Sequence, residues 1–206
     1  MSLILIAHSF ILNMFSGIIK TTQKAGSIKK DKNSMDVAFP IPQSWKLSVG
    51  ESINIDGVCS TVKELNKNSF GVYYMPETLD KTTFGNIESD HIFNLERCLT
   101  LNDLISGHLV YGHVDTTAKV TSIKKNEESV VIKFTLFPEF TKYIVYKGSV
   151  AVNGVSLTIV KVDKDSFTVS LIPHTLTNTN LGELKKGDSV NIEVDMIAKH
   201  IEKLLK

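Results

Sequence analysis

The chain contains the same stretch of sequence twice. Residues 50–96 align with residues 147–193 at a constant offset of 97 without a gap, and 15 of the 47 aligned positions are identical. Several of these identities are Gly, Pro and Asn, the residue types that turns and unusual backbone conformations require. A weaker match extends upstream, where Gly17 and Thr21-Thr22 correspond to Gly112 and Thr116-Thr117. The repeat predicts two similar modules of about 95 residues, and the positions at which the copies differ are the best candidates for chemistry.

Composition narrows the class of protein. With 42% hydrophobic and 22% charged residues, the chain has the make-up of an ordinary globular protein. A net charge of +1 and 8% aromatic residues argue against a nucleic-acid partner, which usually needs a basic face with stacking rings. The two cysteines, Cys59 and Cys98, have no metal-ligand spacing, so we expect reduced thiols in a cytoplasmic protein and no metal site.

The first thirteen residues stand apart from the repeat. Residues 1–13 are apolar and contain no Lys or Arg, so they lack the cationic start of a secretory signal. They are also shorter than the roughly 20 apolar residues that span a bilayer. We expect an extension outside the fold with no membrane partner; a role at a membrane surface is the alternative interpretation.

Short runs rich in Val, Ile, Phe and Tyr, bounded by turn residues, predict β-strands. In the first module they are residues 52–55, 58–65, 70–75 and 92–95, and in the second 119–125, 130–136, 149–152, 155–162, 167–172 and 189–194. Short strands at regular spacing favour a small closed barrel in each module. Residues 42–47 and 138–146 each begin with Pro and are expected to form brief helices. Residues 195–206 carry an apolar stripe at helical spacing, which predicts a terminal amphipathic helix.

Chemistry is expected where the copies differ. Cys59 in the first module aligns with Ser156 in the second, so one copy offers a thiol and the other a hydroxyl. Packing of two small strand residues is the alternative interpretation. Glu77 likewise aligns with His174. Residues 107–115, at the junction of the modules, contain two histidines flanked by glycines, which would bring acid–base groups to a place that the backbone approaches closely. A purely structural role for the two histidines is the alternative interpretation.

Taken together and in order, the motifs of the chain resemble those of riboflavin synthase of the α-chain type. They are Met14-Phe15-Ser16-Gly17-Ile18-Ile19, Asn94-Leu95-Glu96-Arg97, Gly107-His108-Leu109-Val110, Gly112-His113-Val114-Asp115, Lys147-Gly148-Ser149, Gly154-Val155-Ser156-Leu157-Thr158 and Leu171-Ile172-Pro173-His174-Thr175. The resemblance covers Met14 to the end of the chain.

The resemblance implies a mainly β fold of two tandem, homologous, six-stranded Greek-key barrels with a C-terminal α-helix. The expected boundaries are 14–108 and 109–194 for the two lumazine-binding barrels and 195–206 for an oligomerisation helix. The implied activity is a transferase reaction without a cofactor: two molecules of 6,7-dimethyl-8-ribityllumazine give riboflavin and 5-amino-6-ribitylaminouracil. A homotrimer, with each active site between barrels of two subunits, and an association with lumazine synthase are the implied partners.

Roles for individual residues also follow from the resemblance. It assigns proton transfer to His113, orientation of water or substrate to Ser156 and Cys59, and closure of the site to Phe15. Asn153 stands where some members have Asp, so no carboxylate is assumed there. The substrate-binding residues expected in the first barrel are Gly17, Ile18, Ile19, Cys59, Ser60, Thr61, Tyr73, Tyr74, Met75, Pro76, Glu77, Thr78, Gly112, His113 and Val114, and in the second Lys147, Ser156, Leu157, Thr158, Ser170, Leu171, Ile172, Pro173, His174 and Thr175.

A chromophore carrier and a nucleic-acid-binding barrel are the two alternative functions. A non-catalytic lumazine or flavin carrier would bind a chromophore without turnover, but such carriers lack the two-histidine segment that this chain keeps. A small barrel that binds nucleic acid would need a basic groove, which the composition does not favour.

Overall fold

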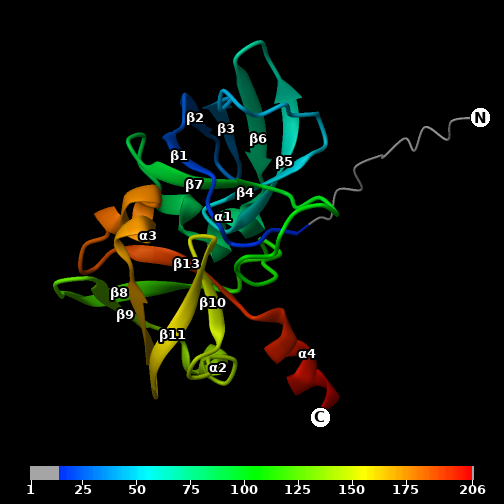
Figure 1. Ribbon diagram of the computed structural model, residues 1–206. Coiled ribbons are helices and arrows are strands. Elements are labelled where there is room, and N and C mark those ends of the chain that lie inside the picture. Colours follow the sequence, from blue (N-terminus) through cyan, green and yellow to red (C-terminus); the bar gives the residue numbers. More distant parts are fainter. Residues whose placement is uncertain (1–13, 206) are drawn as a thin grey trace, which may run out of the picture.

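Two β-rich modules follow one another along the chain, and a helix ends it. The computed structural model describes residues 14–205, and the expected extension 1–13 lies outside the described residues. Figure 1 shows the first module in the upper half of the view, the second in the lower half, and the terminal helix projecting from the second.

The second module is a closed barrel of six strands. Its strands are β8 (Thr116–Lys125), β9 (Val130–Thr135), β10 (Ser149–Val152), β11 (Val155–Asp163), β12 (Ser166–Leu171) and β13 (Ser189–Val194). They are hydrogen-bonded in the order β10-β11-β12-β9-β8-β13, with antiparallel pairing throughout. Strands β10 to β12 are joined in sequence and β9 returns beside β12, which is a Greek key.

The first module follows the same plan with one strand divided. Its strands are β1 (Thr21–Lys24), β2 (Ser27–Lys30), β3 (Met35–Pro40), β4 (Ser52–Ile55), β5 (Val58–Leu65), β6 (Ser69–Tyr74) and β7 (Ile92–Arg97), in the sheet order β1-β7-β4-β5-β6-β3-β2. The two edge strands, β1 and β2, are separated by only Ala25 and Gly26, so the chain itself joins the edges of the sheet. Together they correspond to β8. The fold class predicted from the sequence is confirmed, with strands β1 to β3 added.

Each barrel encloses a separate apolar core. Residues alternate between core and surface along the strands, as in β3, where Met35, Val37 and Phe39 are buried. The same aromatic pair occurs in both cores: the rings of Phe39 and Phe70 are stacked 5.4 Å apart, and those of Phe134 and Phe167 5.3 Å apart. The sequence repeat is therefore a repeat of side-chain packing.

Short helices connect the strands. They are α1 (Pro76–Lys81), α2 (Pro138–Thr141), α3 (Pro173–Asn178), and the 3₁₀ turns η1 (Thr83–Asn86) and η2 (Asn180–Glu183). Three begin with Pro at the first helical position, where its missing N–H costs nothing. The helix expected over residues 42–47 is wrong. That segment makes a single turn, with Trp45 N donating to Pro42 O over 2.8 Å, and Trp45 and Leu47 pack on the first core.

The modules touch at two equivalent hairpin turns. Asp56-Gly57 joins β4 to β5, and Asn153-Gly154 joins β10 to β11, with positive φ at all four residues, the geometry of a two-residue hairpin. A Cβ at Gly57 would lie 2.9 Å from the nitrogen of Gly154. Glycine is therefore required both by the turn and by the contact between the modules.

Buried asparagines bond each module to the turn of the other. Asn94 on β7 donates to the carbonyl of Asn153 over 2.9 Å and accepts from the backbone N–H of Asn180 over 2.7 Å. Reciprocally, Asn191 on β13 donates to the carbonyl of Asp56 and accepts from Thr83 N, both over 2.8 Å. Because these groups are buried, each hydrogen bond satisfies a polar group that water cannot reach.

The terminal helix α4 (Met196–Leu204) is attached along one side only. Lys199 pairs with Asp115 over 2.6 Å, and Lys142 and Tyr143 both donate to Glu202. The opposite side exposes Ile197, Ile201 and Leu204. Within residues 14–205, no helix combines the length and apolar character that a membrane span requires.

Replacing Asn94 by Ala tests the interface between the modules. The change orphans the buried Asn153 carbonyl and Asn180 amide, so we expect a loss of about 2 to 5 kcal/mol in the free energy of unfolding. Urea denaturation at fixed protein concentration measures it. Asn68→Ala, an exposed position whose side chain makes no bond in the described structure, should stay within about 0.5 kcal/mol of the original. Equal midpoints for both variants would contradict the structural role of Asn94.

Candidate active site

Two short segments cross from one module to the other. We call residues 15–18 and 110–113 the crossing segments. They pair with each other through Phe15 and Val110, whose backbone bonds measure 2.7 and 3.0 Å. Beyond this bridge, Gly17 O accepts from Ser156 N over 2.8 Å, and Gly112 O accepts from Cys59 N over 2.7 Å. Each crossing segment therefore lies against the other module's member of the Cys59/Ser156 pair.

Only glycine fits at these two contacts. Gly17 and Gly112 have φ of 73° and 74°, a conformation that side chains disfavour. A Cβ at Gly17 would lie 2.6 Å from Cβ of Ser156, and one at Gly112 would lie 2.7 Å from the nitrogen of Cys59. The close backbone approach explains why both copies carry glycine here.

The residues that follow the crossing segments also pack against the opposite module. Ile19 packs against the core of the second barrel, and Val114 packs against the core of the first. Gly17, Ile18 and Ile19 were predicted to serve the first barrel. The structure instead places Gly17 and Ile19 on the second, because the chain crosses before β1 begins.

Ser156 is hydrogen-bonded to a histidine. Its Oγ lies 2.7 Å from Nδ1 of His108, whose Nε2 is buried without a hydrogen-bond partner among residues 14–205. Burial lowers the pKa of His108 below its ordinary value of 6.5, against the opposing effect of the Asp195 charge. A histidine with a lowered pKa is neutral at neutral pH, so this pair can accept or relay a proton.

Cys59, the counterpart of Ser156, is half-buried and remains a thiol. Burial raises its pKa above the ordinary value of 9.0, although a hydrogen bond from Ser52 opposes the shift. Burial likewise raises the pKa of Cys98 to about 12. Both cysteines are free, and the charged groups that act on them, such as Glu193 on Cys59 and Glu51 and Glu96 on Cys98, favour the thiol over the thiolate.

The outer strand surfaces next to Cys59 and Ser156 expose apolar and hydroxyl side chains. In the first module they are Thr61, Tyr73 and Met75, on β5, β6 and the residue after β6, and in the second Thr158, Ser170 and Ile172, at the equivalent positions of β11 and β12. We call these surfaces the open faces. Tyr73, Met75 and Ile172 are 45%, 59% and 58% exposed. Exposed apolar side chains beside hydroxyls suit a planar ring that carries polar groups.

Five predicted site residues point away from the open faces. Phe15 is fully buried between the modules with Val110, Cys98 and Ala151, so its side chain packs the junction instead of closing a surface site. The other four, Ser60, Tyr74, Leu157 and Leu171, are buried in the barrels because side chains alternate along a strand. Ser60 Oγ and Tyr74 Oη are hydrogen-bonded over 2.8 Å.

Most of the remaining predicted residues are at least partly exposed. Pro76, Glu77, Pro173 and His174 are exposed in the first turns of α1 and α3, and the partly buried Thr78 and Thr175 follow them. Lys147 is exposed, with its Nζ 5.5 Å from the centre of the Tyr146 ring. Ile18 is partly exposed beside Gly17.

The two histidines of the junction differ in their surroundings. His113 donates its backbone N–H to Glu193 and exposes its ring, whereas His108 is partly buried against Ser156. The resemblance assigns proton transfer to His113, whereas the structure pairs His108 with Ser156. The close packing of Gly107 against Ser16 and Ser156, which buries its neighbour His108, could not be derived from the motif.

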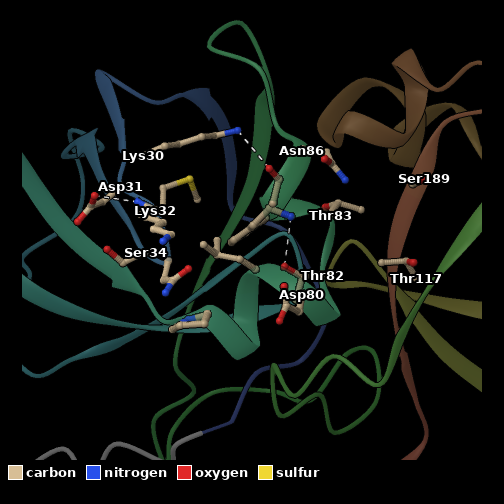
Figure 2. Close-up of a pocket in the computed structure, with 16 residues that line it drawn as sticks. Lys30, Asp31, Lys32, Ser34, Asp80, Thr82, Thr83, Asn86, Thr117 and Ser189 are labelled. Atoms are coloured by element: carbon tan, nitrogen blue, oxygen red, sulfur yellow. Dashed lines mark hydrogen bonds between the residues drawn. The ribbon is translucent and has the colours of Figure 1, made fainter.

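Two cavities lie elsewhere. One of about 550 Å³ is formed by the β2–β3 turn, α1 and η1 with Thr117 and Ser189 of the second module, and its side chains are mainly polar (Figure 2). Another of about 470 Å³ lies near His91, Asn153 and Asn180. Among the predicted site residues, only Pro76 lines the first cavity. Asn153 binds Asn191 N through its side chain and so serves the interface.

The chain is similar to known proteins along most of its length. The lumazine binding domain matches residues 16–98 and 111–195. The chain is 40% identical to riboflavin synthase of Bacillus subtilis over 193 residues, covering 93% of this chain and 90% of that protein. The corresponding values are 39% for riboflavin synthase of Escherichia coli, covering 88% and 87%, and 35% for that of Schizosaccharomyces pombe, covering 94% of each.

Solved structures share the fold. LumP complexed with riboflavin has a TM-score of 0.81 at 22% identity and covers 88% of this chain and 100% of its own. LumP complexed with 6,7-dimethyl-8-(1'-D-ribityl) lumazine has a TM-score of 0.78, with 88% and 99% covered. With two lumazine binding domains and full-length relatives at 35 to 40% identity, the chain belongs to the riboflavin synthase family.

Proposed function

We propose that the protein is a riboflavin synthase, which converts two molecules of 6,7-dimethyl-8-ribityllumazine into riboflavin and 5-amino-6-ribitylaminouracil. The observation that carries this proposal is 40% identity to a riboflavin synthase along nearly the whole length of both chains. The enzyme is a transferase, since one lumazine gives a four-carbon unit to the other. The atoms of two substrates equal those of the two products, so no external oxidant or reductant is consumed.

Each open face binds one lumazine ring. The ring lies on the apolar side chains of the face, and Thr61 and Thr158 bind its polar groups or the ribityl hydroxyls. Holding two rings in contact replaces a bimolecular encounter, which is worth up to about 7 to 11 kcal/mol of the barrier. Because each face is open in the single chain, the second ring is supplied by the face of another subunit.

The His108–Ser156 pair handles a proton at the second face. The C7 methyl of the lumazine is acidic because the ring delocalises the carbanion, so a neutral histidine suffices as base. The lowered pKa of His108 keeps it neutral, and its bond to Ser156 Oγ orients the hydroxyl toward the ligand. At the first face the Cys59 thiol takes the place of Ser156. The role assigned to His113 from the sequence stays a prediction, at the first face.

Subunits associate through α4 as a homotrimer. The exposed side of α4, with Ile197 and Ile201 60% and 52% accessible, is the apolar surface available for this contact. The bonds of α4 to Asp115, Lys142 and Tyr143 hold that surface in a fixed direction. We further propose a cytoplasmic location, consistent with two free cysteines, and an association with lumazine synthase.

Anaerobic incubation with 6,7-dimethyl-8-ribityllumazine tests the activity. We expect riboflavin and 5-amino-6-ribitylaminouracil to form in equal amounts while two lumazines disappear, as followed by absorbance and chromatography. Chromophore bound tightly without turnover would instead identify a carrier. Repeating the assay with a chain that begins at Met14 separates that outcome from a site blocked by residues 1–13.

Replacing His108 by Ala tests the proton-transfer pair. Loss of a positioned acid–base group should lower kcat by about 10²- to 10⁴-fold. In the unchanged protein, the acid limb of the pH–rate profile should lie below pH 6.5, because the lowered pKa keeps His108 neutral down to that range. Ser156→Ala removes the other member of the pair and should also lower kcat, whereas Ser89→Ala, which changes an exposed serine far from Ser156 in sequence, should leave kcat unchanged. Unchanged kcat in His108→Ala would remove this residue from the mechanism.

Replacing Ile201 by Asp tests the association of subunits. A charge in the apolar contact should convert trimers to monomers in sedimentation and abolish turnover, with the circular dichroism spectrum retained. Lys203→Ala changes the same helix outside its apolar stripe and should leave the trimer intact. A trimer that survives Ile201→Asp would contradict the role of α4.

A further inference from the structure

Two buried glutamates hold the crossing segments. Glu96 on β7 accepts from Ser16 N over 2.8 Å, from Ser16 Oγ over 2.6 Å and from Gly17 N over 3.0 Å. Glu193 on β13 accepts from Tyr111 N over 2.6 Å and from His113 N over 2.9 Å. Both carboxyls are nearly inaccessible, and burial raises the pKa of each while the bonds to amides oppose the shift.

Each glutamate belongs to one barrel, but the segment it holds reaches the other. Glu96 lies in the first barrel and binds the N–H of Gly17. The carbonyl of Gly17 in turn accepts a hydrogen bond from the N–H of Ser156 in the second barrel. Glu193 lies in the second barrel and binds the N–H groups of Tyr111 and His113. The carbonyl of Gly112, which lies between them, accepts a hydrogen bond from the N–H of Cys59 in the first barrel. In each case the two carboxylate oxygens bind two amides of one segment, which fixes both the position and the rotation of that segment.

We propose that Glu96 is a positioning residue for the site at Ser156 and that Glu193 is one for the site at Cys59, each acting across the module boundary. This inference rests on the proposed function, in which both sites bind lumazine. Neither glutamate touches the open faces. Their influence passes through Gly17 and Gly112, whose carbonyls set the backbone of Ser156 and Cys59.

The position of Ser156 decides whether it meets His108. Gly107, the neighbour of His108, packs so closely on Ser16 and Ser156 that a Cβ there would lie 2.1 Å from Ser16 O and 2.9 Å from Ser156 Oγ. A displaced crossing segment would therefore disturb the 2.7 Å contact between Ser156 and His108. No comparable histidine contact exists at Cys59 within residues 14–205, so Glu193 positions the first site for binding.

The variants Glu96→Gln and Glu193→Gln test whether each glutamate positions the site in the opposite barrel. A glutamine keeps the shape of the side chain but turns one acceptor into a donor that faces a backbone N–H. The matched control is Glu51→Gln: Glu51 is also a buried glutamate of the first barrel, but it binds Arg97 and Ser48 and not a crossing segment.

The direct readout needs no ligand: hydrogen exchange of the Ser156 and Cys59 amides, followed by NMR on the full chain. In Glu96→Gln the Ser156 amide should exchange at least about 10-fold faster, while the Cys59 amide changes less than about 3-fold. In Glu193→Gln the pattern should reverse, and Glu51→Gln should alter neither amide. Faster exchange at the site of the glutamate's own barrel, at both sites equally, or at neither would overturn the proposal.

Turnover gives the second readout. We expect kcat to fall by about 10²-fold in Glu96→Gln, as for a misplaced catalytic group, with a smaller effect on KM. Glu193→Gln should mainly raise KM, and Glu51→Gln should keep both constants within a few-fold. A wild-type chain without turnover would count against the proposed function alone, because the exchange pattern would still report on the crossing segments. Equal losses of kcat in Glu96→Gln and Glu51→Gln would assign Glu96 a general structural role.

Discussion

The arrangement of the two barrels depends on hydrogen bonds between buried asparagines and the hairpin turns of the opposite module. Asn94 and Asn191 each bond a carbonyl in the other module's turn and an amide that follows its α-helix. A polar group buried without a partner costs about 1 to 3 kcal/mol, so alternative arrangements of the modules are penalised at several atoms at once. The contact of Gly57 with Gly154 adds a steric limit at the same place.

Because the interface between the modules is fixed, each module can supply backbone contacts to the other. One crossing segment of each module lies across the boundary. A glutamate of its own module binds its amides, and its glycine carbonyl contacts Ser156 or Cys59 of the other module. The surroundings of Ser156 and of Cys59 are therefore each built from both modules, and their geometry follows from the interface. The asymmetry lies in the side chains: Ser156 meets a neutral histidine, whereas Cys59 does not. Two similar surfaces with different groups at the equivalent position suit the proposed reaction, in which identical molecules act as donor and acceptor.

The two barrels could be predicted from the sequence, whereas the crossing segments and the pairing of His108 with Ser156 could not. The repeat and the strand patterns predicted two barrels, and strand alternation alone could have excluded Ser60, Tyr74, Leu157 and Leu171 as side-chain contacts. The exchange of segments was not predictable, since a repeat specifies the fold of each copy but not the copy against which a segment packs. His108 and His113 share one motif, and only burial distinguishes them. The repeat aligns Glu96 with Glu193, but that each glutamate binds a crossing segment follows only from the fold.

A crystal structure of the protein with riboflavin bound would test the account most directly. We predict one flavin on each open face: one beside Thr61 and Tyr73 near Gly112, and one beside Thr158 and Ser170 near Gly17 and His108, with the faces of different subunits turned toward each other. Riboflavin in the cavity of about 550 Å³ between α1 and the second module, with the open faces empty, would contradict it.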